Sequence, residues 1–244
     1  MCTLTLVPAN QQLIITMNRD ESIARNEGQP HRWLDSDHPK RWFGTDEATG
    51  GSWFGVNEYG LAVALLNRYQ EHNPEASHSR GELIPSLLRA PSRSAAEHQL
   101  DTTAWPLYDT LDIFLIDHNG MTHTQWDGRC TQRWYEPPGP SLYTSASAAL
   151  AAATLYRQRI FRRHLTSGPP FDPDRLINVH RTRCAERPAL GLLMERPGRH
   201  TKSLCQAVLG DNHIHARYFT RSDLLEGGKP TWERVPSKAS IGAQ

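Results

Sequence analysis

The sequence predicts an α+β protein in which antiparallel sheets are layered and covered by helices. Strand-turn-strand patterns recur along the chain, and helical patterns stand between groups of them rather than after every strand. This order is typical of layered antiparallel sheets, because a doubly wound fold needs a helix between successive parallel strands. No repeat and no linker divides the chain, so we expect one domain over residues 1–244.

Four hairpins are predicted from runs of β-branched and apolar residues that flank short turns. The first begins at the second residue of the chain and turns at Pro8-Ala9-Asn10. The four hairpins span residues 3–17, 50–67, 111–126 and 203–220, and further strands are predicted at 133–137 and 141–146. The polar, proline-containing stretch from Ser22 to Lys40 is assigned no strand. Sheet therefore dominates the predicted structure.

Helical patterns follow the second hairpin and the strand at 141–146. Ser79 and Glu82 have the spacing of a capping box ahead of an apolar run, and helical structure is expected to continue, interrupted, through 95–99. A helix is predicted over 148–165, with Gly168 as its stop. Asp172 before a proline predicts the start of another helix.

The alanine-rich helix predicted at 148–165 carries an apolar stripe and a basic cluster. The stripe is predicted at Ala152, Tyr156, Ile160 and His164. The cluster consists of Arg157, Arg159, Arg162 and Arg163. No stacking aromatics accompany these arginines, so we interpret all four as solvated charge rather than a nucleic-acid footprint.

Composition excludes several classes of function. The formal net charge is +1, which gives no field to attract nucleic acid or an anionic membrane. No run approaches the roughly 18 apolar residues of a spanning helix, and the start of the chain lacks the pattern of a signal peptide. The four scattered cysteines indicate reduced thiols rather than a disulfide framework. We expect a cytoplasmic protein with no metal and no cofactor.

Cys2 is the most informative single residue. A small second residue permits removal of Met1, which would leave a thiol and a free α-amine on one residue. An α-amine has a pKa of about 7.7–8.0, so near neutral pH it can accept the thiol proton directly or through water. Cys2 is therefore a candidate nucleophile that carries its own base, although a Met-Cys start can also occur by accident.

The tetrad Asn18-Arg19-Asp20-Glu21 ends the second predicted strand, so the hairpin folds it back beside Cys2. Arg19 can stabilise the thiolate and Asp20 can orient the α-ammonium. The alternative is a charged turn with a surface ion pair. Trp53, in a glycine-rich segment, can line a ligand pocket or pack in the hydrophobic core. Asn67 ends an apolar strand, where its amide can donate to an oxyanion or merely terminate the strand.

The segments Met-Cys-Thr, NRDE at 18–21, GGSWFGVNEYGLAVALLNR at 50–68 and SRGEL at 79–83 together resemble the NRDE family, also called the Transport and Golgi organization family. That family is in turn similar to N-terminal nucleophile hydrolases of the choloylglycine and penicillin V acylase type. The resemblance covers roughly the first 90 residues. It implies a four-layer αββα fold of two stacked antiparallel sheets, with Cys2 as nucleophile and its own amine as base.

The resemblance also implies roles for individual residues. It maps Asn67 to the oxyanion-hole asparagine of those acylases and places Ser145 where they have a second active-site asparagine, which makes Ser145 a substrate-binding candidate. The acylases separate their Arg and Asp by three positions, whereas Arg19 and Asp20 are adjacent, so Asp20 and Glu21 both remain candidates for orienting the amine.

Two functions remain open from the sequence. The first is hydrolysis of linear amide (C–N) or acyl bonds of a small molecule, with Cys2, Arg19, Asp20 and Asn67 as catalytic residues and Glu21, Trp53 and Ser145 in contact with substrate. The alternative is a non-catalytic protein that binds or traffics haem or an acyl lipid in the same cleft. In both, the partner is a small amide, acyl or haem-like ligand, neither nucleic acid nor membrane. Oligomeric state is left open.

Overall fold

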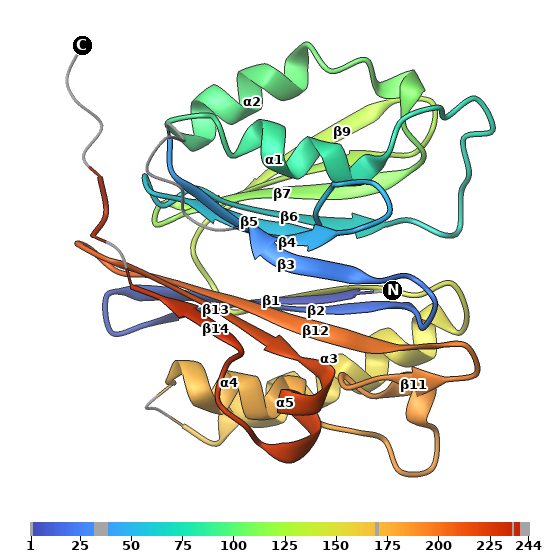
Figure 1. The fold of residues 1–244 in the computed structure, drawn as a ribbon, viewed down its shortest axis with the longest axis vertical. Helices are drawn as coiled ribbons and strands as arrows, with labels where there is room; N and C mark the ends of the chain where they lie inside the picture. Colours follow the sequence, from blue (N-terminus) through green and yellow to red (C-terminus); the bar gives the residue numbers. More distant parts are fainter. Residues whose placement is uncertain (1, 32–38, 169–170, 236, 240–244) are drawn as a thin grey trace.

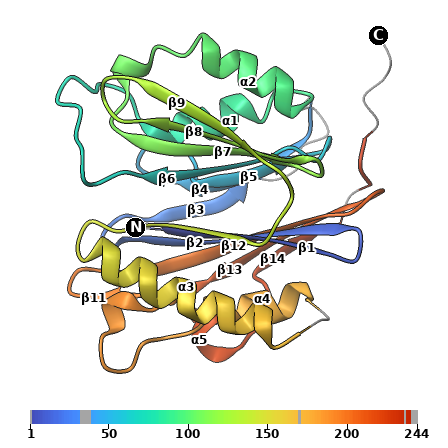
Figure 2. The ribbon, with the colours of Figure 1, turned by 180° about the vertical axis from the view of Figure 1, so that it is seen from behind.

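A computed structural model describes residues 2–31, 39–168, 171–235 and 237–239, and these residues form four layers (Figure 1). Two antiparallel sheets face each other, and helices cover the outer face of each (Figure 2). One sheet is covered by α1 (Leu83–Leu87) and α2 (Arg93–Asp101), the other by α3 (Leu150–Thr166), α4 (Pro173–His180) and α5 (Arg221–Glu226). The predicted αββα arrangement is confirmed.

The first sheet contains both ends of the chain's regular structure. Its strands run in the order β10-β1-β2-β12-β13-β14, and β11 pairs with β12. Their bounds are β10 (Ser141–Ser145), β1 (Cys2–Ala9), β2 (Gln12–Ser22), β12 (Arg199–Leu209), β13 (Ile214–Thr220), β14 (Trp232–Arg234) and β11 (Glu195–Arg196). Because β1 lies between β2 and β10, Cys2 has a paired neighbour on each side.

The second sheet follows the order of the chain. It runs β3 (Glu27–His31), β4 (Arg41–Asp46), β5 (Phe54–Asn57), β6 (Ala62–Asn67), β7 (Leu111–Asp117), β8 (Gly120–Trp126) and β9 (Thr131–Glu136). Short 3₁₀ turns stand at η1 (Arg80–Glu82), η2 (Trp105–Leu107) and η3 (Pro188–Leu190). All four predicted hairpins are present.

Neither the elements β3, β4, β11, β14 and α5 nor the 3₁₀ turns η2 and η3 were predicted from the sequence. Strand β3 lies in the polar stretch that was assigned no strand, and residues 32–38 of that stretch lie outside the described residues. The pairing of β3 with β4 is interrupted by a bulge, and β3 carries polar residues, so no alternation marks it in the sequence. These strands matter below because they carry two carboxylates of the site.

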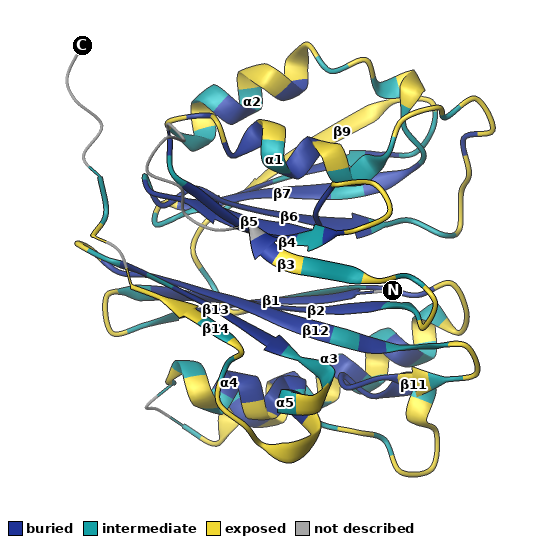
Figure 3. Cartoon of the chain, viewed as in Figure 1, coloured by how far each residue is buried: buried dark blue, intermediate teal, exposed yellow. Residues whose placement is uncertain are grey.

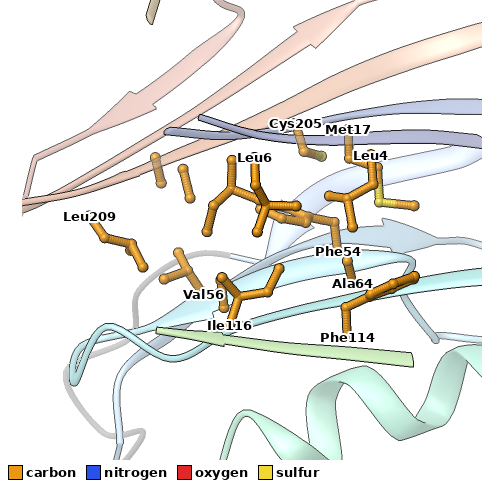
Figure 4. Close-up of a cluster of buried hydrophobic side chains, with 14 of the residues drawn as sticks. Leu4, Leu6, Met17, Phe54, Val56, Ala64, Phe114, Ile116, Cys205 and Leu209 are labelled. Carbon is orange, nitrogen blue, oxygen red and sulfur yellow. The ribbon is translucent and has the colours of Figure 1, made fainter. Parts of the chain in front are cut away.

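The main core lies between the two sheets (Figure 3). Apolar side chains of β1, β2 and β12 meet those of β5, β6 and β7 there, as Figure 4 shows for Leu4, Phe54 and Phe114. Alternation along β1 and β2 directs Val7 and Ile14 to the opposite face, where they pack against α3 and α4. Each of these strands is therefore buried on both faces, which fixes its register.

The capping box predicted at Ser79 is wrong. Ser79 makes no side-chain cap, and the 3₁₀ turn η1 follows it before the predicted helix begins as α1 at Leu83. The Glu82 carboxylate instead accepts a hydrogen bond from the Tyr108 hydroxyl at 2.8 Å, a partner distant in sequence. By contrast, Asp172 caps α4 as predicted, since its carboxylate accepts from the Arg175 amide at 2.8 Å.

The stripe predicted along α3 is displaced by about one position. Its buried residues are Ala153, Arg157, Phe161 and His164, so only His164 belongs to the predicted stripe. The interpretation of Arg157 as solvated charge is wrong, because its side chain is fully buried, whereas Arg159, Arg162 and Arg163 are exposed as expected. Burial is possible because polar groups of the sheet surround the Arg157 guanidinium. Pro169 and Pro170, which follow the predicted stop, lie outside the described residues.

Candidate active site

Cys2 begins β1 at the end of the inter-sheet space. The register places it opposite Arg19 of β2 and opposite Ser145 of β10. Its side chain belongs to the inter-sheet core and is 9% exposed. A cavity of about 380 Å³ opens beside it, lined by Cys2, Arg19, Asp20, Glu21, Arg25, Asp46, Thr49, Gly51, Ser52, Trp53, Leu65, Asn67, His72, Ala76, His78, Ser79, Arg80, Gly81 and Asp109. Both sheets thus contribute walls to one cavity that Cys2 borders.

The backbone of Cys2 is held by polar side chains of β10. Its nitrogen donates to the Ser145 hydroxyl at 3.1 Å, and its carbonyl accepts from the Thr144 hydroxyl at 3.0 Å. Ser145 therefore contacts the nitrogen that would become an α-amine on loss of Met1. Met1 itself lies outside the described residues.

The Cys2 thiol is poised between opposing influences. Burial raises its pKa, and the nearby Asp20 carboxylate raises it further, while the Asp20 backbone amide and the Arg19 guanidinium lower it. The net direction is upward, so the isolated thiol is mostly protonated at neutral pH. A nucleophilic role therefore requires a base close to the sulfur.

Arg19 lies on the cavity side of β2 and is clamped by the other sheet. Its guanidinium donates to Glu27 at 2.7 Å, forms an ion pair with Asp46, and stands 4.3 Å from the centre of the Trp53 ring. Although burial lowers the pKa of Arg19, the two carboxylates outweigh it and raise that pKa. Arg19 is thus a fixed cation whose charge is largely neutralised by Glu27 and Asp46. These two carboxylates were not identified from the sequence.

Asp20 points to the opposite face of the sheet, toward α3. Its carboxylate is fully buried, 3.4 Å from an Arg157 guanidinium nitrogen, and accepts from the Thr201 hydroxyl at 2.5 Å. Burial raises the pKa of Asp20 even though Arg157 and Thr201 stabilise its anion. Asn18, on the same face, uses its amide to hold the carbonyls of His180 and Leu192. Successive residues of the tetrad therefore contact different layers: Arg19 contacts the other sheet, and Asp20 contacts α3.

Glu21 is half-buried at the mouth of the cavity. It accepts from the Ser22 amide at 2.7 Å and from Arg199 at 3.2 Å, and lies 3.8 Å from Arg25. Burial acts to raise its pKa, but the Ser22 amide and the neighbouring arginines prevail and lower it. Glu21 is therefore anionic at neutral pH.

Asn67 ends β6 across the cavity from Cys2. Its side-chain nitrogen lies 3.3 Å from the Tyr69 hydroxyl, to which it donates. Burial raises the pKa of Tyr69, and the nearby Cys2 raises it further, so the phenol stays protonated. Trp53 lines the same cavity and is buried. The other six residues selected from the sequence thus line the same cavity as Cys2 or contact its backbone. Tyr69, Glu27, Asp46 and Arg157 were missed because no local pattern marks them.

The described part of the chain offers no cluster of three or more His, Cys, Asp or Glu residues with the geometry of a metal site. None of its helices combines the length and the apolar character that a bilayer crossing demands.

The family model described as Transport and Golgi organisation 2 matches residues 1–125, which is 125 of the 244 residues. The chain belongs to this family. A mouse member, the Transport and Golgi organization 2 homolog, is 26% identical over 145 residues, or 59% of this chain and 51% of the mouse protein. The chain therefore spans about half the length of the curated relative it matches.

Solved structures show how this Transport and Golgi organisation 2 family member is folded. A Caenorhabditis elegans orthologue of N-acylethanolamine-hydrolyzing acid amidase superposes with a TM-score of 0.59 at 13% identity, covering 84% of this chain and 92% of that one. An arginine-to-leucine variant of Clostridium perfringens conjugated bile acid hydrolase gives 0.60 at 12% identity over 97% and 92%. A cysteine-to-alanine mutant of the same enzyme gives 0.55 at 12% identity over 97% and 92%. The fold is that of N-terminal nucleophile hydrolases, as the resemblance implies.

Proposed function

We propose that this protein is an N-terminal-cysteine amidohydrolase that acts on an amide or acyl bond of a small molecule, with Cys2 as nucleophile after removal of Met1. The carrying observation is that Cys2, whose nitrogen donates to Ser145, lines the same cavity as Asn67. The solved neighbours named as amidase and hydrolase support the same chemistry.

The proposed reaction has two stages. The α-amine of Cys2 takes the thiol proton, and the thiolate attacks the substrate carbonyl carbon to form a tetrahedral intermediate. When the C–N bond breaks, the leaving amine receives the proton from the α-ammonium, and a thioester remains on Cys2. Water then loses a proton to the α-amine and attacks the thioester, and the C–S bond breaks to release a carboxylic acid and restore the thiol.

Surrounding residues have distinct parts in this scheme. The Asn67 amide donates to the oxyanion of the tetrahedral intermediate together with a backbone amide. Ser145 holds the α-amine, and Asp20 stabilises it when protonated. Arg19 favours the thiolate, but Glu27 and Asp46 reduce that effect. Glu21 and Trp53 contact the substrate at the mouth and on the wall of the cavity.

The cavity favours a small polar substrate. Arg25 and Arg80 line it beside Glu21 and Asp109, so its walls carry both signs of charge. Such walls suit an amide whose acyl or amine part bears polar or charged groups. Its volume of about 380 Å³ is at the lower end of the range for small-molecule sites.

Intact-mass analysis tests this proposal. The intact mass of the purified protein is first measured to establish that Met1 is absent, and the protein is then incubated with panels of linear amides and thioesters. We expect an acyl adduct that disappears in Cys2→Ala and persists in Cys130→Ala, which removes an exposed thiol. Retention of Met1, or an adduct that survives in Cys2→Ala, would refute the assignment.

A second candidate is a non-catalytic protein that binds haem or an acyl lipid in the same cleft. Burial raises the pKa of the Cys2 thiol, which favours this second candidate because a protonated thiol is a neutral lining group of the cleft and a poor nucleophile. Haem titration followed by absorbance tests this candidate. Saturable binding that is weakened in Cys2→Ala, with no acyl adduct in the wild type, would favour it over hydrolysis.

A further inference from the structure

Arg157 is a fully buried cation in the layer between α3 and the first sheet. Its guanidinium touches three strands: it donates to Thr3 of β1 at 2.7 Å, to Thr144 of β10 at 2.6 Å and to Asp20 of β2 at 3.4 Å. It also donates to the Gly191 carbonyl at 3.1 Å. An arginine can donate to all of these acceptors at once because its five N–H donors lie on three nitrogens of a planar group, whereas the donors of a lysine lie on one nitrogen.

These contacts converge on the backbone of Cys2. The Thr144 hydroxyl that receives the Arg157 hydrogen bond donates in turn to the Cys2 carbonyl at 3.0 Å. The next residue, Ser145, accepts from the Cys2 nitrogen at 3.1 Å. On the other side of β1, the backbone amide of Asp20 reaches the Cys2 sulfur. Arg157 thus contacts one element on each side of Cys2.

A purely structural role explains this arrangement poorly. Burying a guanidinium carries a large desolvation penalty, and an apolar side chain of similar volume at such a site is often as stable or more stable. A buried charge aimed at another buried charge is more typical of a functional site.

We propose that Arg157 is a positioning residue, which holds the Asp20 carboxylate and the Cys2 backbone in the geometry that the α-amine needs to act as a base. This inference rests on the proposed function of Cys2. Arg157 touches neither the cavity nor the reacting atoms, and it acts through Asp20 and Thr144.

The electrostatic consequence follows from the groups that face Asp20. These are Arg157 from α3, the thiol and nitrogen of Cys2 from β1, and Thr201 with His200 from β12. His180 of α4 lies nearby, but burial lowers its pKa to about 3, so it is neutral and does not replace Arg157. Without Arg157, the buried Asp20 takes up a proton at a higher pH and no longer stabilises the α-ammonium.

Three variants test the inference: Arg157→Met removes the charge, Arg157→Lys keeps it without the fork, and Arg162→Met is a control on the exposed face of the same helix. Alkylation of Cys2 by iodoacetamide is followed against pH by peptide mass spectrometry, with Cys130 as internal reference. We expect the midpoint for Cys2 to rise by about one pH unit in Arg157→Met, because the thiolate loses a cation that attracts it and the α-ammonium loses the Asp20 anion. The rise should be smaller in Arg157→Lys and absent in Arg162→Met.

The outcomes separate this inference from the proposed function. A folded Arg157→Met protein with the wild-type midpoint overturns the positioning role. If Arg157→Met does not fold, Arg157→Lys decides: slower alkylation of Cys2 at pH 7 supports the role, and an unchanged rate overturns it. Absence of turnover in the wild type, with the expected midpoint shift in the variants, sinks the hydrolase proposal alone. Where turnover is seen, the positioning role predicts that Arg157→Lys lowers kcat and leaves KM nearly unchanged.

Discussion

Replacement of Arg19 by methionine removes the cation that joins the two sheets beside Cys2. The side chains of Arg19, Glu27 and Asp46 are only 5%, 8% and 6% exposed, so the variant leaves two buried carboxylates, of which Asp46 still pairs with Arg25. Breaking a buried pair in this way destabilises a protein by about 3–5 kcal/mol. Loss of the contact with Trp53 adds roughly 0.5–2 kcal/mol.

A double-mutant cycle with Glu27→Gln isolates the interaction between the two side chains. Because Glu27 also accepts from Ser203 at 3.0 Å and from Tyr218 at 2.6 Å, Glu27→Gln alone is expected to be destabilising. In the double variant one buried carboxylate and its cation are removed together. The total loss should therefore be smaller than the sum of the single losses by about 1–3 kcal/mol.

Urea denaturation at pH 7, followed by tryptophan fluorescence, gives these free energies of unfolding, and Arg162→Met serves as the surface control. If Arg19→Met lowers the free energy of unfolding by less than about 1 kcal/mol, or if the losses in the cycle are strictly additive, the ion pairs of Arg19 with Glu27 and Asp46 do not hold the sheets together.

Three further outcomes are expected. Asn67→Ala should lower kcat of the proposed hydrolysis by about 10²–10³ with little change in KM, as steady-state kinetics would show. Because burial lowers the pKa of His180 from 6.5 to about 3, the unfolded chain binds this proton first as the pH falls. The free energy of unfolding should therefore decline by up to about 1.4 kcal/mol per pH unit below pH 6.5, and His180→Gln should flatten that decline in acid titrations. Phe54→Ala, in the inter-sheet core, should destabilise by about 3–5 kcal/mol, whereas Leu155→Ala on the exposed face of α3 should have little effect by thermal unfolding.

The first hairpin could be predicted from the sequence because its signals are local. Alternating β-branched residues and a short turn define β1 and β2, and the length of the turn then fixes the register that brings Arg19 opposite Cys2. The cap at Asp172 is local in the same sense, since its donor, the Arg175 amide, lies within one helical turn. Patterns confined to a few residues were therefore sufficient for the frame of the site.

The partners of the site could not be predicted in this way. Glu27 belongs to a polar strand, Asp46 ends a short strand of mixed composition, and the pairing of the two strands contains a bulge, so neither residue lies in a recognisable alternation. Arg157 stands among exposed arginines and differs from them by a rotation of the helix that only the packing of α3 determines. In each case a charge is buried because a charge distant in sequence meets it, and that pairing appears only in three dimensions.

The split of the tetrad between two faces suggests why the nucleophile belongs at the start of a strand. Side chains of β2 alternate, so Arg19 faces the cavity while Asp20 faces α3. A nucleophile within a strand presents its side chain to one face only, and its backbone nitrogen is occupied by the ladder. If Cys2 carries a free amine, its side chain can face the cavity while its nitrogen donates to Ser145 and interacts electrostatically with Asp20 and Arg157. The proposed chemistry therefore uses both faces of one sheet, which requires a residue whose nitrogen donates to a side chain rather than to the backbone of the sheet.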